Sequence, residues 1–152
     1  MSEPYASPVR FVVERIHAAA VYCSDGRVGA AFDDFLTTGL DLPRYDRVAM
    51  PGGPACLAGH PEARLEEQGL LDELKFLVDA HALDRVILIQ HAGCAFYSER
   101  IQIAPARMAG LQRADLVRAA HFVRKTTPLS RVEGWMANII DDQITFEPVD
   151  VD

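Results

Sequence analysis

Short runs that are apolar at every position alternate along this chain with longer stretches whose apolar residues have helical spacing. The clearest run is Val-Ile-Leu-Ile at residues 86–89, between the charged pair Asp84 and Arg85 and a turn that contains Gly93. Four apolar residues without alternation, three of them β-branched, are typical of a strand buried on both faces of a sheet. We therefore expect residues 86–89 to form a central strand.

The same reading gives the other regular elements. Short apolar runs bounded by turn residues predict further strands at residues 18–23, 45–50, 131–140 and 144–146. Apolar residues at helical spacing predict helices at residues 28–36, 61–78 and 108–125. This order of strands and helices predicts an α/β fold in three layers, with helices on both faces of a mostly parallel sheet and an antiparallel strand at the C-terminal edge.

The remaining segments give weaker signals. Residues 51–54 and 95–107 are expected to be irregular, and residues 9–16 fit either a strand or a helical turn. Residues 1–8 are small and polar with two prolines, which is typical of a flexible or partner-docked arm. No internal repeat or low-complexity tract is present, so we expect residues 1–152 to form a single domain.

The composition and net charge of the chain argue against some classes of function. The 152 residues are 49% hydrophobic and carry a net charge of −7, which argues against an extended nucleic-acid surface. No apolar run approaches the roughly 20 residues of a membrane span, and residues 1–8 lack the features of a signal peptide. We therefore expect a cytoplasmic protein without a membrane partner. Three cysteines, an odd number, argue against a disulfide framework and leave metal binding or catalysis open.

Chemically useful side chains follow two of the predicted strands. Cys23, Asp25 and Arg27 come after the strand at residues 18–23, and His91 and Cys94 follow the central strand. Because the carboxyl ends of parallel strands meet at one edge of a sheet, we expect these side chains to converge. Two thiolates and one imidazole suit tetrahedral zinc, and three protein ligands leave a fourth position open, as in catalytic zinc sites.

Other candidate groups are assigned simpler roles. Cys56 is interpreted as a spare cysteine; as a fourth ligand it would close the site and make it structural. Four histidines are interpreted as structural or surface residues: His17, His60, His81 and His121. Four basic residues of the last helix are interpreted as a solvated face or subunit contact: Arg113, Arg118, Arg124 and Lys125.

Residues 23–27, Cys-Ser-Asp-Gly-Arg, match the C-x-D-x-R motif of the β-class carbonic anhydrases, and residues 91–94, His-Ala-Gly-Cys, match their H-x-x-C motif. The chain resembles this family over most of residues 18–94 and over residues 131–146. The resemblance implies reversible hydration of carbon dioxide to bicarbonate by a zinc-bound hydroxide. It also implies zinc held by Cys23, His91 and Cys94, a catalytic dyad of Asp25 and Arg27, and a homodimer or larger homo-oligomer.

The resemblance also implies two possible states for Asp25, because in some members the matching Asp is a fourth zinc ligand until Arg pairs with it. The chain departs from the family at three places. Residues 50–54, Met-Pro-Gly-Gly-Pro, replace an Arg-x-Ala-Gly-Asn-like stretch, Ala95 replaces a glycine, and the N-terminal helical arm is nearly absent. These changes concern the substrate pocket more than the metal site. A zinc-binding relative without carbon dioxide activity, either a hydrolase on a related small molecule or a silent interaction module, therefore stays an alternative.

A second alternative is a cysteine-dependent phosphatase. Cys94 and Arg100 have the C-x5-R spacing at which a thiolate and an arginine share a phosphate. However, a phosphate-binding loop needs small residues whose amides point inward, and this segment contains bulky Phe96 and Tyr97 and acidic Glu99. The carbonic anhydrase resemblance is therefore the favoured interpretation.

Overall fold

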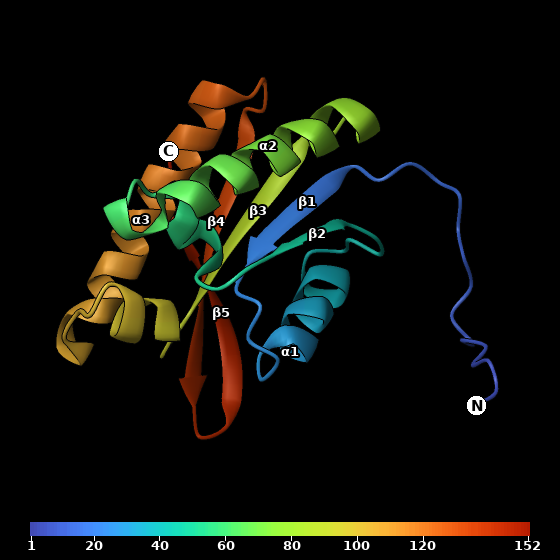
Figure 1. Ribbon diagram of the computed structural model, residues 1–152, viewed down its shortest axis with the longest axis horizontal. Helices are drawn as coiled ribbons and strands as arrows, with labels where there is room; N and C mark the ends of the chain where they lie inside the picture. The colour runs from blue at the N-terminus through green and yellow to red at the C-terminus, as the bar shows by residue number, and fades with distance from the viewer.

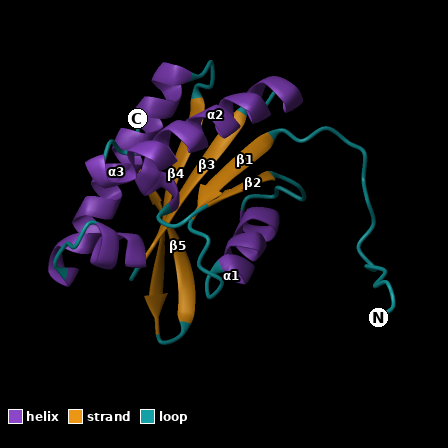
Figure 2. Cartoon of the chain, in the orientation of Figure 1, coloured by secondary structure: helices purple, strands orange, loops and turns teal.

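The structure is a computed structural model that describes all residues, 1–152. It contains one five-stranded sheet (Figures 1 and 2), whose strands are β1 (Ala18–Tyr22), β2 (Asp46–Ala49), β3 (Arg85–His91), β4 (Arg131–Ile140) and β5 (Gln143–Val149). The α-helices are α1 (Gly29–Asp34), α2 (Arg64–His81) and α3 (Pro105–Thr126). Short helical turns are η1 (Phe35–Gly39), η2 (Gly53–Leu57), η3 (Pro61–Ala63) and η4 (Phe96–Arg100).

The strand order is β2-β1-β3-β4-β5, with four parallel strands and β5 antiparallel to β4. The run at residues 86–89 therefore lies in the central strand, as its pattern predicts. The antiparallel strand at the C-terminal edge is also confirmed, because β4 and β5 form a hairpin around Asp141 and Asp142. Both aspartates have positive φ angles, which a tight hairpin connection requires.

Helices cover both faces of the sheet, which confirms the three-layer architecture. Side chains alternate in β3: Val86 and Leu88 pack with α2 and α3 on one face, whereas Ile87 and Ile89 pack with α1 and η1 on the other. All of these side chains are fully buried. Burial of a side chain of this size contributes about 1.5–3 kcal/mol, so the central strand anchors both layers.

Several sequence predictions need correction. Residues 51–54 are not wholly irregular, because Gly53 and Pro54 begin the 3₁₀ helix η2. Residues 95–107 contain the helical turn η4 and the first turn of α3, which begins at Pro105. In η4 the buried rings of Phe96 and Tyr97 hold the segment against the core, and Pro105 occupies a first-turn position that suits its missing N–H.

The N-terminal segment lies apart from the sheet. Residues 9–16 form neither a strand nor a helix, and the chain before β1 extends away from the body of the protein (Figure 1). Four of its large apolar side chains are more than three-quarters exposed: Tyr5, Val9, Phe11 and Val13. None of the helices combines the length and hydrophobicity that a membrane span requires.

Candidate metal centre

The carboxyl ends of β1 and β3 lie at the same edge of the sheet. The two strands pair in parallel register, with Val21 opposite Leu88, so Cys23 and His91 leave their strands at neighbouring positions. Gly93 has a φ of +71°, which lets the chain turn back within three residues and bring Cys94 beside them. The expected convergence of the two motifs is therefore present in the structure.

Three ligand atoms gather at this edge. One atom each from Cys23, His91 and Cys94 lies within 4.8 Å of the other two, and the two sulfur atoms are 3.9 Å apart. All three residues are buried. Buried sulfur and imidazole groups at this separation form a set that one metal ion can bridge.

The imidazole of His91 is oriented for metal binding. Its Nδ1 lies 2.9 Å from the carbonyl oxygen of Ala92, so Nδ1 carries the proton and donates it there. This tautomer leaves the lone pair of Nε2 free, and Nε2 is buried without a hydrogen-bond partner. A buried polar atom without a partner is costly. Zinc at Nε2 would remove that cost, so the residues fit the ion that the family resemblance implies.

The sulfur atoms interact electrostatically with each other. The hydrogen bond from Cys94 lowers the pKa of Cys23 to about 4, with further contributions from the neighbouring His91 and the Gly52 amide, whereas burial opposes this shift. Cys94 donates this hydrogen bond and is buried, and both effects raise its pKa. The pocket therefore stabilises one thiolate at neutral pH. Binding of a cation would favour the second thiolate, with release of its proton.

The glycine pair before η2 lets the chain pass close to the sulfur atoms. Gly52 and Gly53 have φ angles of +85° and +49°. A Cβ atom on Gly53 would lie 2.6 Å from the carbonyl carbon of Tyr22 and 2.8 Å from the amide nitrogen of Cys23. This segment therefore contributes a backbone amide, that of Gly52, rather than a charged side chain to the surroundings of Cys23.

Asp25 and Arg27 form a bidentate ion pair beside this cluster. The guanidinium donates hydrogen bonds of 3.0 Å from Nε to Oδ1 and 2.7 Å from Nη2 to Oδ2, and the Arg27 backbone N–H donates to Oδ1 at 2.9 Å. These hydrogen bonds lower the pKa of Asp25 to about 2. Asp25 is not among the gathered ligand atoms, so its carboxylate is engaged with Arg27 in this structure.

A cavity of about 410 Å³ opens next to the cluster. Asp25, Arg27 and His91 are among its polar lining residues, and four apolar side chains also line it: Val28, Ala92, Ile139 and Ile144. The two isoleucines belong to the β4–β5 hairpin, whose tip also supplies Asp142. Sequence analysis did not connect this hairpin with the site, because nothing in its pattern indicates that its tip reaches the ends of β1 and β3.

The other sequence candidates lie outside the cluster. Cys56 is buried, its thiol donates to the carbonyl oxygen of Pro51, and burial raises its pKa to about 12. Arg100 pairs with Glu66 at 3.2 Å and lies over the ring of Phe96. Because Cys94 is fully buried and Arg100 is engaged elsewhere, the geometry of a phosphate-binding loop is not formed.

His60 makes a structural contact with α3, which agrees with its interpretation as a structural or surface residue. Its Nε2 lies 2.6 Å from Oδ2 of Asp115, a fully buried carboxylate on α3. Sequence analysis missed Asp115 and the neighbouring buried Gln112. A signal was available, because both occupy the apolar stripe of α3 at the same spacing as Met108 and Leu116.

Comparisons with known proteins agree with this architecture. A family model described as "Putative carbonic anhydrase" matches residues 13–150. The fold and the match define the chain as carbonic anhydrase-like, and the chain belongs to this family. No curated protein matches the sequence.

Solved structures with the same fold include two β-carbonic anhydrases. Isoform I from the protozoan Trichomonas vaginalis aligns with a TM-score of 0.59 at 11% sequence identity, over 91% of this chain and 87% of that chain. CafA from the fungus Aspergillus fumigatus aligns with a TM-score of 0.52 at 15% identity, over 91% of this chain and 77% of that chain. The fold is therefore that of the β-carbonic anhydrases.

Proposed function

We propose that this protein is a zinc-dependent enzyme that hydrates carbon dioxide reversibly to bicarbonate. The observation that carries the proposal is the buried set of Cys23, His91 and Cys94 beside the Asp25–Arg27 ion pair. Zinc held by these three residues would supply Lewis acidity, which lowers the pKa of water toward about 7 and provides a nucleophile at neutral pH.

The ion pair has the chemistry needed to orient that nucleophile. Arg27 keeps Asp25 ionised and occupies its two oxygen atoms from the solvent side. An ionised carboxylate accepts hydrogen bonds and donates none. Asp25 would therefore accept a hydrogen bond from the attacking hydroxide and direct the hydroxide's lone pair toward the substrate.

The adjoining cavity has the character that a small neutral substrate needs. Val28, Ile139 and Ile144 give it apolar walls, whereas Asp25, Arg27, His91 and Asp142 are its polar lining residues. Carbon dioxide carries no charge and fits an apolar pocket, whereas bicarbonate, as an anion, would interact with Arg27. We place carbon dioxide against the apolar wall and assign Arg27 to the side from which product leaves.

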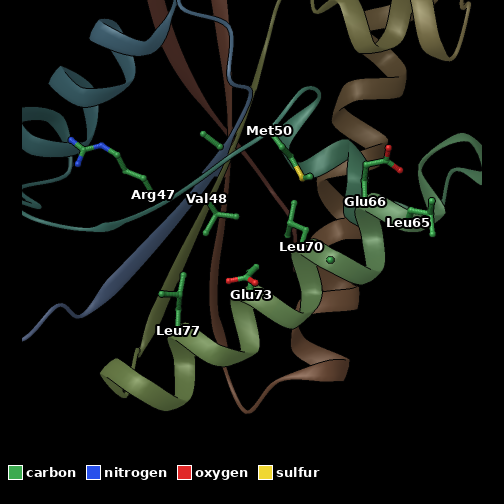
Figure 3. Close-up of a pocket in the computed structure, with 10 residues that line it drawn as sticks. Arg47, Val48, Met50, Leu65, Glu66, Leu70, Glu73 and Leu77 are labelled. Carbon is green, nitrogen blue, oxygen red and sulfur yellow. The ribbon is translucent and has the colours of Figure 1, made fainter.

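We also propose that the protein acts as a homodimer or larger homo-oligomer in which the N-terminal arm of one copy docks on another. A groove of about 570 Å³ runs between β2 and α2 (Figure 3). Val48 and Met50 line one side of it, and Leu70 and Leu77 of α2 face them. Because β2 is an edge strand, it has no neighbour on its outer side.

The arm has the composition to fill this groove. Val9, Phe11 and Val13 are exposed at alternate positions, which gives an extended segment one apolar side. Glu66 and Glu73 line the groove, so an acidic residue on the apolar side of the arm would be disfavoured there. The Arg15 side chain donates a hydrogen bond to the carbonyl oxygen of His81, which holds the end of the arm nearest β1 at the C-terminal end of α2. The residues before Arg15 extend away from the body of their own subunit (Figure 1).

Metal analysis and kinetics test the proposed activity together. We expect purified protein to retain about one zinc ion per chain after exhaustive dialysis, and stopped-flow assays to show carbon dioxide hydration. Zinc without hydration would favour the silent relative. Protein that folds but holds no zinc would exclude the proposed metal chemistry altogether.

A further inference from the structure

Helix α3 carries two polar side chains in a face that is otherwise apolar. Gln112 and Asp115 are 1% and 0% exposed, and they lie among Met108, Leu116 and Ala119 on the buried side of the helix. Buried polar groups cost free energy unless they are hydrogen-bonded. Their partners therefore indicate what the two side chains do.

Gln112 reaches the end of the central strand. Its Nε2 donates a hydrogen bond of 2.7 Å to the backbone carbonyl oxygen of His91. This contact connects α3 directly to the residue that offers the imidazole, one peptide unit before the chain turns at residues 92–93. The carbonyl and the side chain of His91 share one Cα atom, so the bond restricts where the imidazole can lie.

Asp115 holds the other side of the turn. Its Oδ2 accepts a hydrogen bond of 2.7 Å from the hydroxyl of Tyr97, and this hydroxyl accepts one of 2.8 Å from Nε2 of Gln90. The backbone N–H of Tyr97 donates to the carbonyl oxygen of Cys94 at 3.1 Å. The fully buried ring of Tyr97 therefore connects α3, β3 and the turn that contains Cys94.

Two further donors complete the environment of Asp115. His60 lies at 2.6 Å from Oδ2, and Arg118 donates to Oδ1 at 3.0 Å. Apolar residues of similar volume would pack in such a place without the cost of removing a carboxylate from water. A buried carboxylate with donors from separate segments instead favours one arrangement of those segments. This property matters most where ligand positions must be maintained closely.

We propose that Gln112 and Asp115 are positioning residues that fix the backbone of His91 and the turn at Cys94 for metal binding. The inference depends on the proposed zinc centre and identifies residues that would hold its ligands in place. Neither side chain reaches the metal. Gln112 acts through the carbonyl of His91, and Asp115 acts through Tyr97.

The most specific test is Tyr97→Phe, which removes one hydroxyl and keeps the ring in the core. We expect zinc affinity, measured by competition with a chelator, to fall about tenfold, the lower end of the range for residues that support metal ligands. The visible absorption bands of the cobalt(II)-substituted protein should also shift, because they report ligand geometry. Leu116→Ala is the matched control, since Leu116 is fully buried on the same helix and outside the network. It should lower Tm yet leave zinc affinity within about twofold and the cobalt spectrum unchanged.

Two substitutions of Asp115 separate positioning from packing. Asp115→Asn keeps an oxygen that accepts the Tyr97 hydroxyl, so most of the zinc affinity should remain, whereas Asp115→Ala should lose at least as much as Tyr97→Phe. Wild-type affinity and spectrum in Tyr97→Phe would overturn the role of Asp115, which acts through Tyr97, while leaving the zinc centre intact. Equal losses in Leu116→Ala would also overturn it, because α3 packing alone would then explain the effect. A wild-type protein that binds neither zinc nor cobalt would overturn the proposed function and this inference with it.

Discussion

At the scale of single residues, the side chains at the candidate site have separate tasks. Cys23 and Cys94 offer the sulfur atoms, and His91 offers a nitrogen lone pair with no other partner. Asp25 is bound by Arg27 and lies outside this set. A change in the first group should therefore affect retention of the metal, whereas a change in the ion pair should affect the rate of the reaction.

Three substitutions test this division. Asp25→Asn and Arg27→Ala should each lower kcat/KM for carbon dioxide hydration by about 10–100-fold, within the range of groups that orient a reacting water, and should retain about one zinc per chain. Cys94→Ser should lose most of the zinc, because a hydroxyl is a much poorer zinc ligand than a thiolate. Stopped-flow hydration assays and elemental analysis of the same preparations measure both properties. A wild-type rate in Asp25→Asn would remove Asp25 from the mechanism even if the enzyme is active.

At the scale of secondary structure elements, the strands could be predicted most directly. β1 and residues 86–89 of β3 are apolar without interruption because both faces of the sheet are covered, and this pattern does not resemble that of an amphipathic helix. The positions of Cys23 and His91 at the strand ends then follow from the parallel topology. The gathering of Cys23, His91 and Cys94 could therefore be expected from sequence, since it depends on two strand ends and one tight turn.

The segments between the strands could not be predicted in the same way. η2 and η4 are single helical turns whose conformation depends on tertiary packing, such as burial of Phe96 and Tyr97 against the core. Contacts from α3 were also missed, because a glutamine and an aspartate in an apolar stripe are compatible with a helix but do not identify their partners. The β4–β5 hairpin lines the cavity because of the length of its two strands. The residues of its turn do not indicate that length.

The segment from Gly52 into η2 provides a prediction at this scale. Gly53→Ala should destabilise the protein by about 1–3 kcal/mol, because the new Cβ meets the backbone of Tyr22 and Cys23 at a φ angle that alanine rarely adopts. The same displacement should move Cys23 and lower zinc occupancy. Urea unfolding and zinc analysis measure the two effects.

Gly59→Ala is the control for backbone strain. Gly59 has a φ of +85°, but a Cβ atom there would meet nothing within 4 Å. Its substitution should therefore cost only the strain, about 1 kcal/mol, and leave zinc occupancy unchanged. Equal costs and full zinc occupancy in both variants would show that the close approach of Gly53 to β1 is not needed for the site.

At the scale of the whole molecule, the isolated chain leaves several apolar side chains uncovered, and two of the surfaces that they form concern assembly. One is the alternating side of the arm at Val9, Phe11 and Val13, and the other is the groove between β2 and α2. The groove includes Met50, whose backbone oxygen accepts hydrogen bonds from Ser24 and Gly53 in the loops around the metal cluster. Filling the groove with a partner's arm would therefore support those loops as well as join two copies.

The last prediction concerns this assembly. Removal of residues 1–13, or the single change Phe11→Asp, should shift the protein from dimer or larger oligomer to monomer at micromolar concentration. Burial of a phenylalanine side chain contributes about 1.5–3 kcal/mol, and both variants lose this contribution. In Phe11→Asp the new carboxylate would also face Glu66 and Glu73 of the groove. Leu77→Asp, at a partly buried residue that lines the groove, should have the same effect, provided circular dichroism shows that the fold is kept. Val117→Asp is the control, since Val117 is a partly exposed apolar residue of α3 outside the groove. Light scattering distinguishes the states: a dimer that survives removal of the arm would require another interface, and a monomeric wild-type protein would exclude arm exchange.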